Sequence, residues 1–276
     1  MAQAKILKRR IKSAKNISQI TRAMQMVAAA KMKKAQDAAL VNRNYAEKLL
    51  EMTGKLIPYM EKNKSAALRE LYLVITPNKG LCGSLNTFLT KKILEIIKEK
   101  RDMADFVLLG KKGEAAVAKY SGQVKAAFVY GLTQPKYEVI VPITKLILED
   151  YKLGKYAKVF VLYTDYVNTL VQRPRVLQIL PVLKEEATIE NEIEYIFEPS
   201  KEHLIRELIP YYVKNQLFQL LLESYASEQS ARMIAMKNAT DNAKEIMKEL
   251  TLVYNRERQT QITNEIADIA TAQLVI

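Results

Sequence analysis

Several residue types are scarce in this 276-residue chain, which has one cysteine, one histidine and no tryptophan. The lone cysteine, Cys82, permits no internal disulfide bond and is consistent with a reducing compartment. The lone histidine, His203, has no second imidazole or cysteine cluster with which to complete a metal site. We therefore expect no metal site and no bound cofactor.

Long uncharged stretches are also missing. The longest run without a charged side chain covers eleven residues, Gly80 to Thr90, whereas a helix needs about 20 apolar residues to span a bilayer. Residues 1–12 carry basic side chains, but no apolar core or cleavage site follows them. We expect no transmembrane helix, no signal peptide and no transit peptide.

Helix breakers are missing from the last quarter of the chain. All eight prolines lie at or before Pro210 and the last glycine is Gly154, so residues 211–276 contain neither. This segment is rich in good helix formers and predicts one continuous helix about 100 Å long. Residues 2–57 hold one breaker, Gly54, before Pro58, and predict a second helix about 80 Å long.

Both predicted helices carry a stripe of apolar and small residues with the spacing of a coiled coil. The first stripe is rich in alanine and serine, so a partner backbone can approach closely although each contact buries little area. Two such helices at the ends of one chain predict an antiparallel pair with the central segment inserted between them. The first stripe comprises Leu7, Ile11, Ala14, Ser18, Thr21, Met24, Ala28, Met32, Ala35, Ala39, Asn42, Ala46 and Leu49, and the second comprises Ala235, Ala239, Ala243, Ile246, Leu250, Val253, Ile262, Ile266 and Ile269.

The central segment alternates short apolar runs with helical patterns, which argues for a mainly parallel sheet covered by helices. Strands are expected at 71–76, 105–109, 124–130, 159–163, 175–180 and 193–197, and helices at 85–100, 112–120 and 137–151. The predicted fold class is α/β, with a Rossmann-like domain inserted into a long antiparallel two-helix coiled coil. Its parts are an amino-terminal coiled-coil helix at 1–57, the α/β domain at 68–200 and a carboxy-terminal coiled-coil helix at 205–276.

The loop PNKGLCGS, residues 77–84, follows the first predicted strand, where an open parallel sheet binds phosphate groups. It has neither the glycine and lysine spacing of a P-loop nor the glycine spacing of a dinucleotide fold. Glycines that permit a tight turn are the simpler interpretation. Glu185 and Glu186 fit a charged loop better than an acid/base pair, and Cys82 has no histidine nearby in sequence. We predict no catalytic residue.

The net charge is +13, and residues 1–60 hold 13 basic side chains against 3 acidic ones. Such a segment could attract nucleic acid, anionic lipid or an acidic protein surface. One alternative is therefore a nucleic-acid-binding protein, although residues 1–44 contain no aromatic side chain for base stacking. A second alternative, a nucleotide-binding enzyme on the central sheet, is disfavoured by the loop at 77–84.

Four stretches resemble the gamma subunit of bacterial F-type (proton-translocating) ATP synthases, in the expected order and across essentially the whole chain. They are ITRAMQMVAAAKM at 20–32, KGLCGSLN at 79–86, SEQSARMIAMKNAT at 227–240, and LVYNRERQ at 252–259 followed by Ile262 and Thr263.

The resemblance implies a non-catalytic rotor shaft, the central stalk, which couples ion flow through the c ring to ATP synthesis or hydrolysis at β subunits. The two helices would stand inside a ring of α and β subunits, and the α/β domain would bind the epsilon subunit and the c ring, with no nucleic acid involved. The protein would lie peripherally on the cytoplasmic face of the bacterial inner membrane. Cys82 alone excludes the dithiol switch of the chloroplast form.

Contact residues can be carried over only where these motifs align. Arg258 and Gln259 match positions that hydrogen-bond a loop of a β subunit, and Met24 matches a position near another, acidic β segment. Phe197 and Glu198 match the position that meets the polar loops of the c ring. The same resemblance gives an acidic partner to the basic face formed by Arg9, Arg10, Lys12, Lys31, Lys33 and Lys34.

Overall fold

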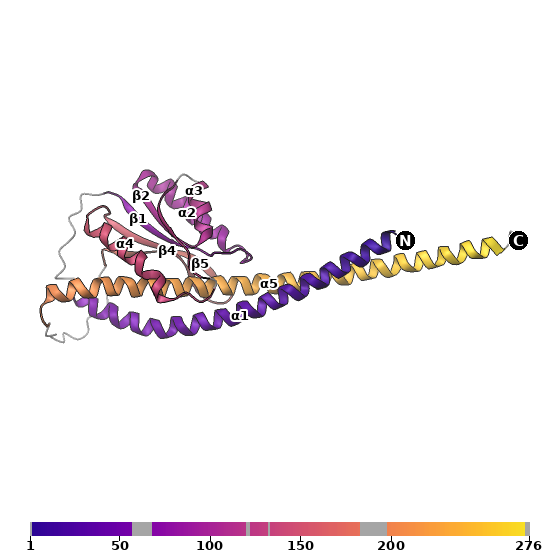
Figure 1. Ribbon diagram of the computed structural model, residues 1–276, viewed down its shortest axis with the longest axis horizontal. Helices are drawn as coiled ribbons and strands as arrows, with labels where there is room; N and C mark the ends of the chain where they lie inside the picture. Colours follow the sequence, from indigo (N-terminus) through magenta and orange to yellow (C-terminus); the bar gives the residue numbers. More distant parts are fainter. Residues whose placement is uncertain (1, 57–67, 120–121, 132, 183–197, 274–276) are drawn as a thin grey trace. The chain divides into compact units, whose positions relative to one another are not determined.

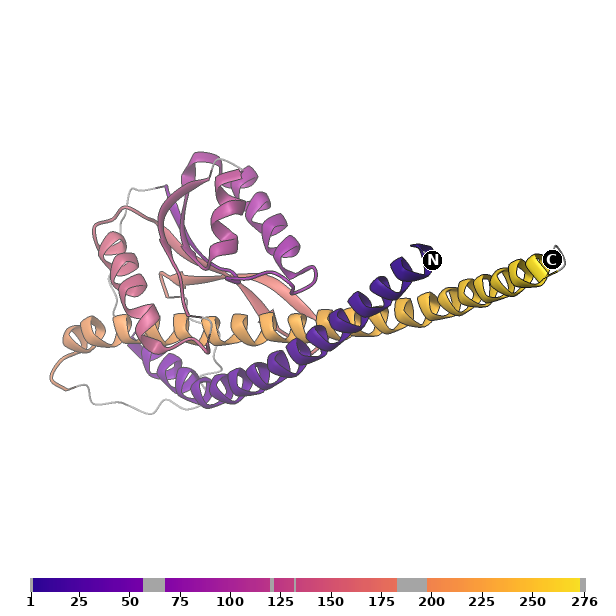
Figure 2. The same cartoon turned by 45° about the vertical axis from the view of Figure 1, so that its right-hand side comes forward.

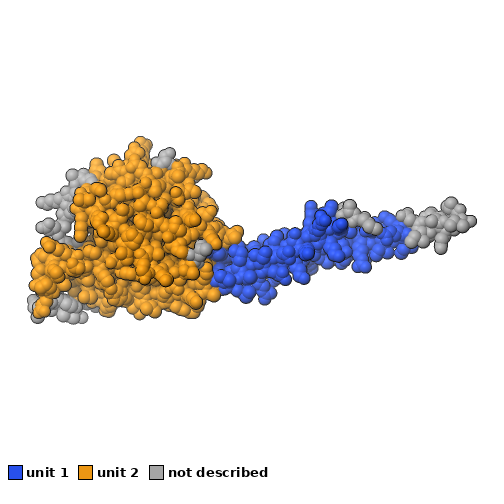
Figure 3. Space-filling view, in the orientation of Figure 1, with its two compact units in different colours: residues 1–28, 232–276 blue, residues 29–231 orange. Residues whose placement is uncertain are grey.

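The computed structural model describes residues 2–56, 68–119, 122–131, 133–182 and 198–273. Two long helices account for nearly half of the chain, α1 (Ala2–Leu56) and α5 (Lys201–Gln273) (Figure 1). The chain divides into two compact units, residues 1–28 with 232–276 and residues 29–231, and both helices contribute to each unit (Figure 3). We call these the helical unit and the α/β unit. Within the described ranges, no helix combines the length and hydropathy needed to cross a membrane.

The α/β unit is built on a five-stranded sheet with the order β3-β2-β1-β4-β5. Neighbouring strands are parallel except β5, which runs antiparallel to β4. This confirms the prediction of a mainly parallel sheet, whereas the strand expected at 193–197 lies outside the described residues. The strands are β1 (Glu70–Ile75), β2 (Ala104–Leu109), β3 (Gln123–Phe128), β4 (Lys158–Tyr166) and β5 (Gln172–Leu180).

The two faces of the sheet are covered by different helices, because alternate strand residues point to opposite faces. Leu71, Leu73 and Ile75 of β1 share a core cluster with α4 (Ile140–Lys152) and with parts of α1 and α5. Tyr72 and Val74 belong to the other cluster, with α2 (Leu85–Lys100) and α3 (Lys111–Lys119). Short 3-10 turns at Arg101–Met103 and Tyr137–Val139 precede β2 and α4. The α/β unit therefore has three layers, with the sheet in the middle. α2 and α3 cover one face of the sheet, and α4 with parts of α1 and α5 covers the other.

The stripe predicted for the first helix is confirmed, since all thirteen of its residues are buried or half-buried in α1. The stripe predicted for the second helix is partly wrong. Ile246 and Val253 are about half exposed, at 50% and 48%, and Ile262 and Ile266 are exposed as well. Ala235, Ala239, Ala243 and Leu250 of this stripe are buried or half-buried, and the side chain of Ile269 lies outside the described part. One line of covered side chains on α5 recurs in steps of four and three, at Met236, Thr240, Ala243, Met247, Leu250, Tyr254, Glu257 and Gln261. A heptad seam follows this geometry even where its residues are polar.

The second long helix also begins earlier than residue 211, where the breaker-free segment starts. Ser200 caps it, because its side-chain oxygen accepts a hydrogen bond of 3.2 Å from the backbone N–H of His203. Pro210 then lies inside α5, although a proline there removes one backbone hydrogen bond. Ile209, Tyr212 and Val213 around it are buried in the core of the α/β unit, so burial of neighbouring apolar side chains offsets that loss.

Candidate functional site

The carboxyl ends of the parallel strands form the edge at which open α/β sheets bind phosphate groups. Here the first backbone N–H groups of α3 bond to the chain itself. Lys111 N donates to Asn78 Oδ1 (3.2 Å), Lys112 N to the Pro77 carbonyl (3.1 Å) and Gly113 N to Thr76 Oγ1 (2.9 Å). A helix N-terminus binds anions through such N–H groups, and in α3 the loop after β1 already occupies them.

Backbone approach at this edge is close. Gly110 has a φ of +110°, and a Cβ atom there would lie 1.9 Å from the carbonyl oxygen of Thr76. The absence of a side chain at this glycine therefore allows the ends of two neighbouring strands to pack closely, and it does not open a space for a ligand. The interpretation of the edge as tight turns is consistent with this geometry.

The switch point of the sheet lies between β1 and β4, where an open α/β fold usually holds its ligand. Residues of α5 fill it. Ser224 Oγ accepts a hydrogen bond of 2.9 Å from Thr164 N, and Ser227 Oγ donates one of 3.1 Å to the Thr164 carbonyl. The Tyr130 hydroxyl also contacts the carboxylate of buried Glu228 at 3.0 Å. A helix of the chain thus takes the place that a nucleotide takes in related sheets, which counts against the nucleotide-binding alternative.

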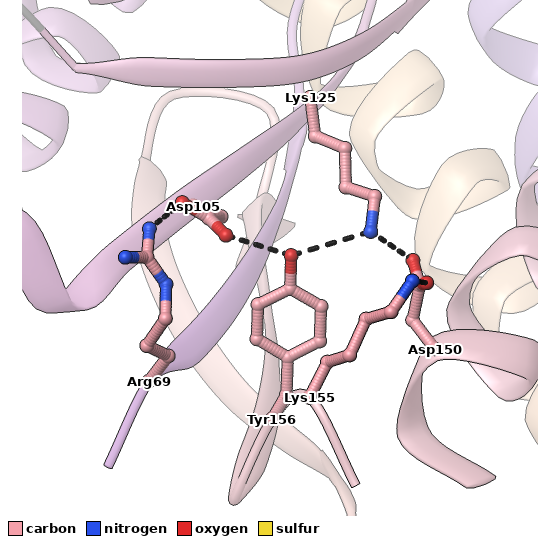
Figure 4. Close-up of polar contacts among 6 residues, drawn as sticks. All are labelled: Arg69, Asp105, Lys125, Asp150, Lys155 and Tyr156. Atoms are coloured by element: carbon pink, nitrogen blue, oxygen red, sulfur yellow. Dashed lines mark hydrogen bonds and ion pairs between the residues drawn. The ribbon is translucent and has the colours of Figure 1, made fainter. Parts of the chain in front are cut away.

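A charged cluster lies at the opposite, amino-terminal edge of the sheet (Figure 4). Asp105 of β2 accepts hydrogen bonds from Arg69 and from the Tyr156 hydroxyl, the latter at 2.7 Å. Asp150 of α4 pairs with Lys125 of β3 and, at 2.8 Å, with Lys155. Lys125 Nζ also lies 3.4 Å from the Tyr156 hydroxyl, which links the two halves of the cluster.

The electrostatics of this cluster indicate a structural role. We call its six residues, Arg69, Asp105, Lys125, Asp150, Lys155 and Tyr156, the charged clasp. Burial opposes ionisation of Asp150, but the hydrogen bonds from Lys125 and Lys155 outweigh it and lower the pKa of the carboxyl. Burial, followed by the hydrogen bond to Asp105, raises the pKa of the Tyr156 hydroxyl. Each carboxylate is neutralised by cations and the phenol stays protonated, so no group is prepared to act as a general base or a nucleophile.

Metal binding has no obvious location either. Within the described ranges, no three side chains of His, Cys, Asp or Glu come together as ligands of one ion. Cys82 is only 1% exposed and packs in the core with α2, and His203 is exposed in the first turn of α5.

The predicted contact residues lie on different parts of the chain. Arg258 and Gln259 are neighbours on the exposed surface of α5 in the helical unit, and Met24 of the same unit is half-buried in the seam. Glu198 is exposed shortly before α5 in the α/β unit, and Phe197 lies outside the described residues. Arg258 and Gln259 are adjacent in sequence, and Glu198 belongs to the other unit.

The helical unit also has a distinctive surface charge. Residues 1–28 contain no acidic residue, and seven basic side chains there are exposed: Lys5, Lys8, Arg9, Arg10, Lys12, Lys15 and Arg22. The other predicted basic residues, Lys31, Lys33 and Lys34, belong to the α/β unit, where Lys33 pairs with Asp37 at 2.9 Å. The part of α1 in the helical unit is therefore suited to an acidic surface.

Sequence reasoning missed the residues of α5 that fill the switch point of the sheet. Ser224, Ser227 and Glu228 are polar residues of α5 that follow the apolar run Leu220–Leu222 and flank Tyr225 and Ala226. Polar residues so close to an apolar run are the one signal that could have found them. Asp105 and Asp150 gave no comparable signal, because a carboxylate at a strand start or a helix end is common on protein surfaces.

Comparison with known proteins identifies the class first. The fold is that of an ATP synthase central stalk. An OSCP, F1 and c-ring structure of the Euglena gracilis mitochondrial ATP synthase has a TM-score of 0.74 at 18% identity, covering 99% of this chain and 94% of that one. A central stalk and c-ring structure of the Tetrahymena thermophila mitochondrial ATP synthase has a TM-score of 0.63 at 26% identity, covering 80% and 99%.

Sequence comparison identifies the family. The ATP synthase family model matches residues 3–273. The ATP synthase gamma chain of Dehalococcoides mccartyi is 41% identical, over 98% of this chain and 97% of that one. The chain therefore belongs to the ATP synthase gamma-chain family.

Proposed function

We propose that this chain is the non-catalytic central-stalk subunit of a bacterial F-type ATP synthase, where it couples ion flow through a c ring to ATP synthesis or hydrolysis at β subunits. The observation that carries the proposal is the full-length match to bacterial gamma chains. The filled switch point of the sheet supports the proposal, because α5 occupies the place where a nucleotide would bind. Nucleotide chemistry is then left to partner subunits.

The helical unit is the part we assign to the ring of α and β subunits. α5 runs on beyond the start of α1 (Figure 2). Arg258 and Gln259 are exposed on α5. Exposed side chains on a long helix can meet different partner subunits in turn as it rotates. Rotation then changes the relative affinities of the surrounding sites, because a partner shifts an equilibrium only by unequal contact with its states.

The remaining contacts are assigned by the same reasoning. The exposed cations of residues 1–15 would face acidic β segments, with Met24 close to the same contact. Glu198 and Phe197 would meet the c ring, and the α/β domain would also bind the epsilon subunit. The functional parts we propose are a helix at 1–57, the α/β domain at 68–200 and a helix at 205–276. We place the assembled subunit on the cytoplasmic face of the cell membrane.

The assignment of Arg258 and Gln259 can be tested in the assembled enzyme. The variant Arg258→Ala with Gln259→Ala should still co-purify with α, β and epsilon chains. ATP synthesis driven by an imposed ion gradient in membrane vesicles should fall several-fold, because the hydrogen bonds to a β loop are lost at a step in rotation.

A matched control replaces two exposed residues of the same helix outside the motif, Asn242→Ala with Lys248→Ala, and should leave synthesis close to the parent rate. Equal synthesis by the Arg258/Gln259 variant and the parent would remove these residues from the contact. Failure of the parent chain to co-purify with α and β chains would instead contradict the stalk function itself.

A further inference from the structure

The seam between α1 and α5 is built mostly from side chains that do not specify one alignment. Residues spaced one heptad apart along α1 are all buried or half-buried. Alanine or leucine stands at most of these places, and a slide by one heptad, about 10 Å, would put one such residue where another had been. The heptad positions are Leu7, Ala14, Thr21, Ala28, Ala35, Asn42, Leu49 and Leu56.

Two of the positions are polar, and each contacts a polar residue of α5. In the helical unit, Thr21 Oγ1 lies 2.7 Å from Thr240 Oγ1. In the α/β unit, Asn42 Nδ2 donates a hydrogen bond of 2.8 Å to Gln219 Oε1. Thr240 and Gln219 are 3% and 5% exposed, so both partners on α5 are withdrawn from water.

Each contact is embedded in further hydrogen bonds. Gln219 Nε2 donates to Glu223 Oε1 at 2.9 Å, so both ends of the Gln219 amide are engaged. Thr21 and Thr240 also approach carbonyl oxygens of their own helices, at Ile17 (2.9 Å) and Met236 (2.8 Å). Since a hydroxyl has one proton, one threonine donates to the other and the second donates to its own helix.

The two pairs agree on a single alignment. Asn42 lies 21 residues after Thr21, and Gln219 lies 21 residues before Thr240. Twenty-one residues are three heptads, so both pairs belong to the same antiparallel register although each lies within its own unit. A slide by one heptad breaks both pairs together.

The consequence of such a slide follows from the sequence. Ala14 or Ala28 would replace Thr21 opposite Thr240, and Ala35 or Leu49 would replace Asn42 opposite Gln219. Gln219 would then keep its bond to Glu223, but its buried amide oxygen would lose the donor, which costs more than the hydrogen bond itself contributed. In the same slide the apolar positions exchange alanine for alanine, leucine for leucine or alanine for leucine, but they still place an apolar side chain in the seam. Only the polar pairs lose hydrogen bonds.

We propose that Thr21–Thr240 and Asn42–Gln219 are register pairs, which select one alignment of α1 against α5 among those that the alanine-rich seam would accept. A buried polar residue in an otherwise apolar seam selects register at some cost in stability. The inference rests on the fold and not on the proposed function.

Disulfide trapping in the full-length chain tests the register directly. Cys82→Ala removes the native thiol, and Ser18→Cys is then combined in turn with Ala243→Cys, Met236→Cys or Leu250→Cys. Ser18 and Ala243 lie at one level in the observed register, and the other two positions lie one heptad to either side. In this background mild oxidation should give the Ser18/Ala243 disulfide almost alone.

The register variant carries Thr21→Ala, Thr240→Ala, Asn42→Leu and Gln219→Leu. Loss of two ordinary hydrogen bonds predicts that a shifted disulfide, at Met236 or Leu250, becomes about tenfold more abundant. Thr251→Ala with Thr263→Ala is the matched control, because these exposed hydroxyls bond only to carbonyls of their own helix. It should give the parent pattern.

A second variant separates register selection from folding. Exchanging the amides, Asn42→Gln with Gln219→Asn, keeps a polar pair at the same level and should retain the single disulfide. If the four-residue register variant gives the parent pattern, the proposal is wrong. It is equally wrong if that variant loses its helical circular dichroism, since the pairs would then be needed for folding and not for the choice of register.

Discussion

The two units of this chain are stabilised by side chains of very different size. The α/β unit buries large apolar groups such as Phe106, Leu73 and Ile143, each with 0% of its surface exposed. In the helical unit the buried positions of α1 are Leu7, Ala14, Ser18 and Ala28, and most other side chains reach solvent. Because the hydrophobic free energy scales with buried apolar area, most of the stability of the chain lies in the α/β unit.

This difference separates stability from contact. A two-helix pair has no interior beyond its seam, so nearly every other position is surface and can meet a partner. The α/β unit uses its residues to fill the sheet, including the place where a ligand would bind. The helical unit is thus the better part for contacts that change in turn, and the α/β unit for a fixed attachment.

The largest expected effect is on the core of the α/β unit. Phe106→Ala should lower the free energy of unfolding by about 3–5 kcal/mol, because it removes a large side chain and leaves a cavity beside Tyr72, whose ring it stacks on at 5.8 Å. Denaturant unfolding followed by circular dichroism measures this. Phe88→Ala, at a ring that is 47% exposed, should cost far less. Equal costs for the two would contradict the assignment of stability to this core.

A smaller effect is expected in the seam of the helical unit. Ala28 is 1% exposed, so Ala28→Leu should push the helices apart and cost about 1–3 kcal/mol. Ala23→Leu, at an exposed position of the same helix, is the control and should be nearly neutral. Thermal unfolding of both variants makes the comparison. If Ala28→Leu stabilises the chain, the seam is not closely packed and the contrast between the units fails.

The charged clasp predicts an effect that depends on pH. Asp150→Asn should cost about 1–2 kcal/mol at pH 7, because it removes a charged partner of Lys125 and Lys155. The pKa of Asp150 is lowered from an ordinary 3.8, so its contribution is present above pH 3.8 and is lost as the pH falls through the folded value. The gap between parent and variant should therefore close only in strong acid.

Denaturant unfolding between neutral and strongly acidic pH measures this gap. Glu149→Gln is the matched control, because this neighbouring carboxylate is 62% exposed and lies 3.9 Å from Lys145. It should change stability little at any pH. A gap for Asp150→Asn that does not depend on pH would show that the ionised carboxylate is not what holds the clasp.

The smallest effect on stability is expected at the proposed contact. Arg258→Ala with Gln259→Ala should change the free energy of unfolding of the isolated chain by less than about 0.5 kcal/mol, as for most surface substitutions. Both side chains are exposed on α5. Denaturant unfolding of the isolated chain would reveal a larger loss, which would mean that these residues support the helix and that an effect on ATP synthesis is indirect.

Much of the fold was predictable because its patterns are local. The absence of proline and glycine after residue 210 is enough to indicate a long helix, and the alternation of apolar runs with helical patterns indicates a parallel sheet. The expected helix at 85–100 coincides with α2 (Leu85–Lys100). The breaker-free segment begins only at residue 211, whereas α5 begins at Lys201, because a capping serine and buried neighbours allow Pro210 within the helix. The contact residues Arg258, Gln259, Met24, Phe197 and Glu198 stay predictions, since they depend on resemblance.

By itself, the sequence determined which segments are helices and strands, the alanine-rich stripe of α1 and the basic surface near its start. These follow from the properties of neighbouring residues. Only the tertiary structure decided which face of α5 is covered, so that Thr240 and Tyr254 lie in the seam while Ile246 and Val253 do not. The tertiary structure also decided that Ser224 and Ser227 of α5 fill the switch point of the sheet. Such choices depend on residues far apart in sequence, whose pairing is set by geometry and hydrogen bonding and not by hydrophobicity alone.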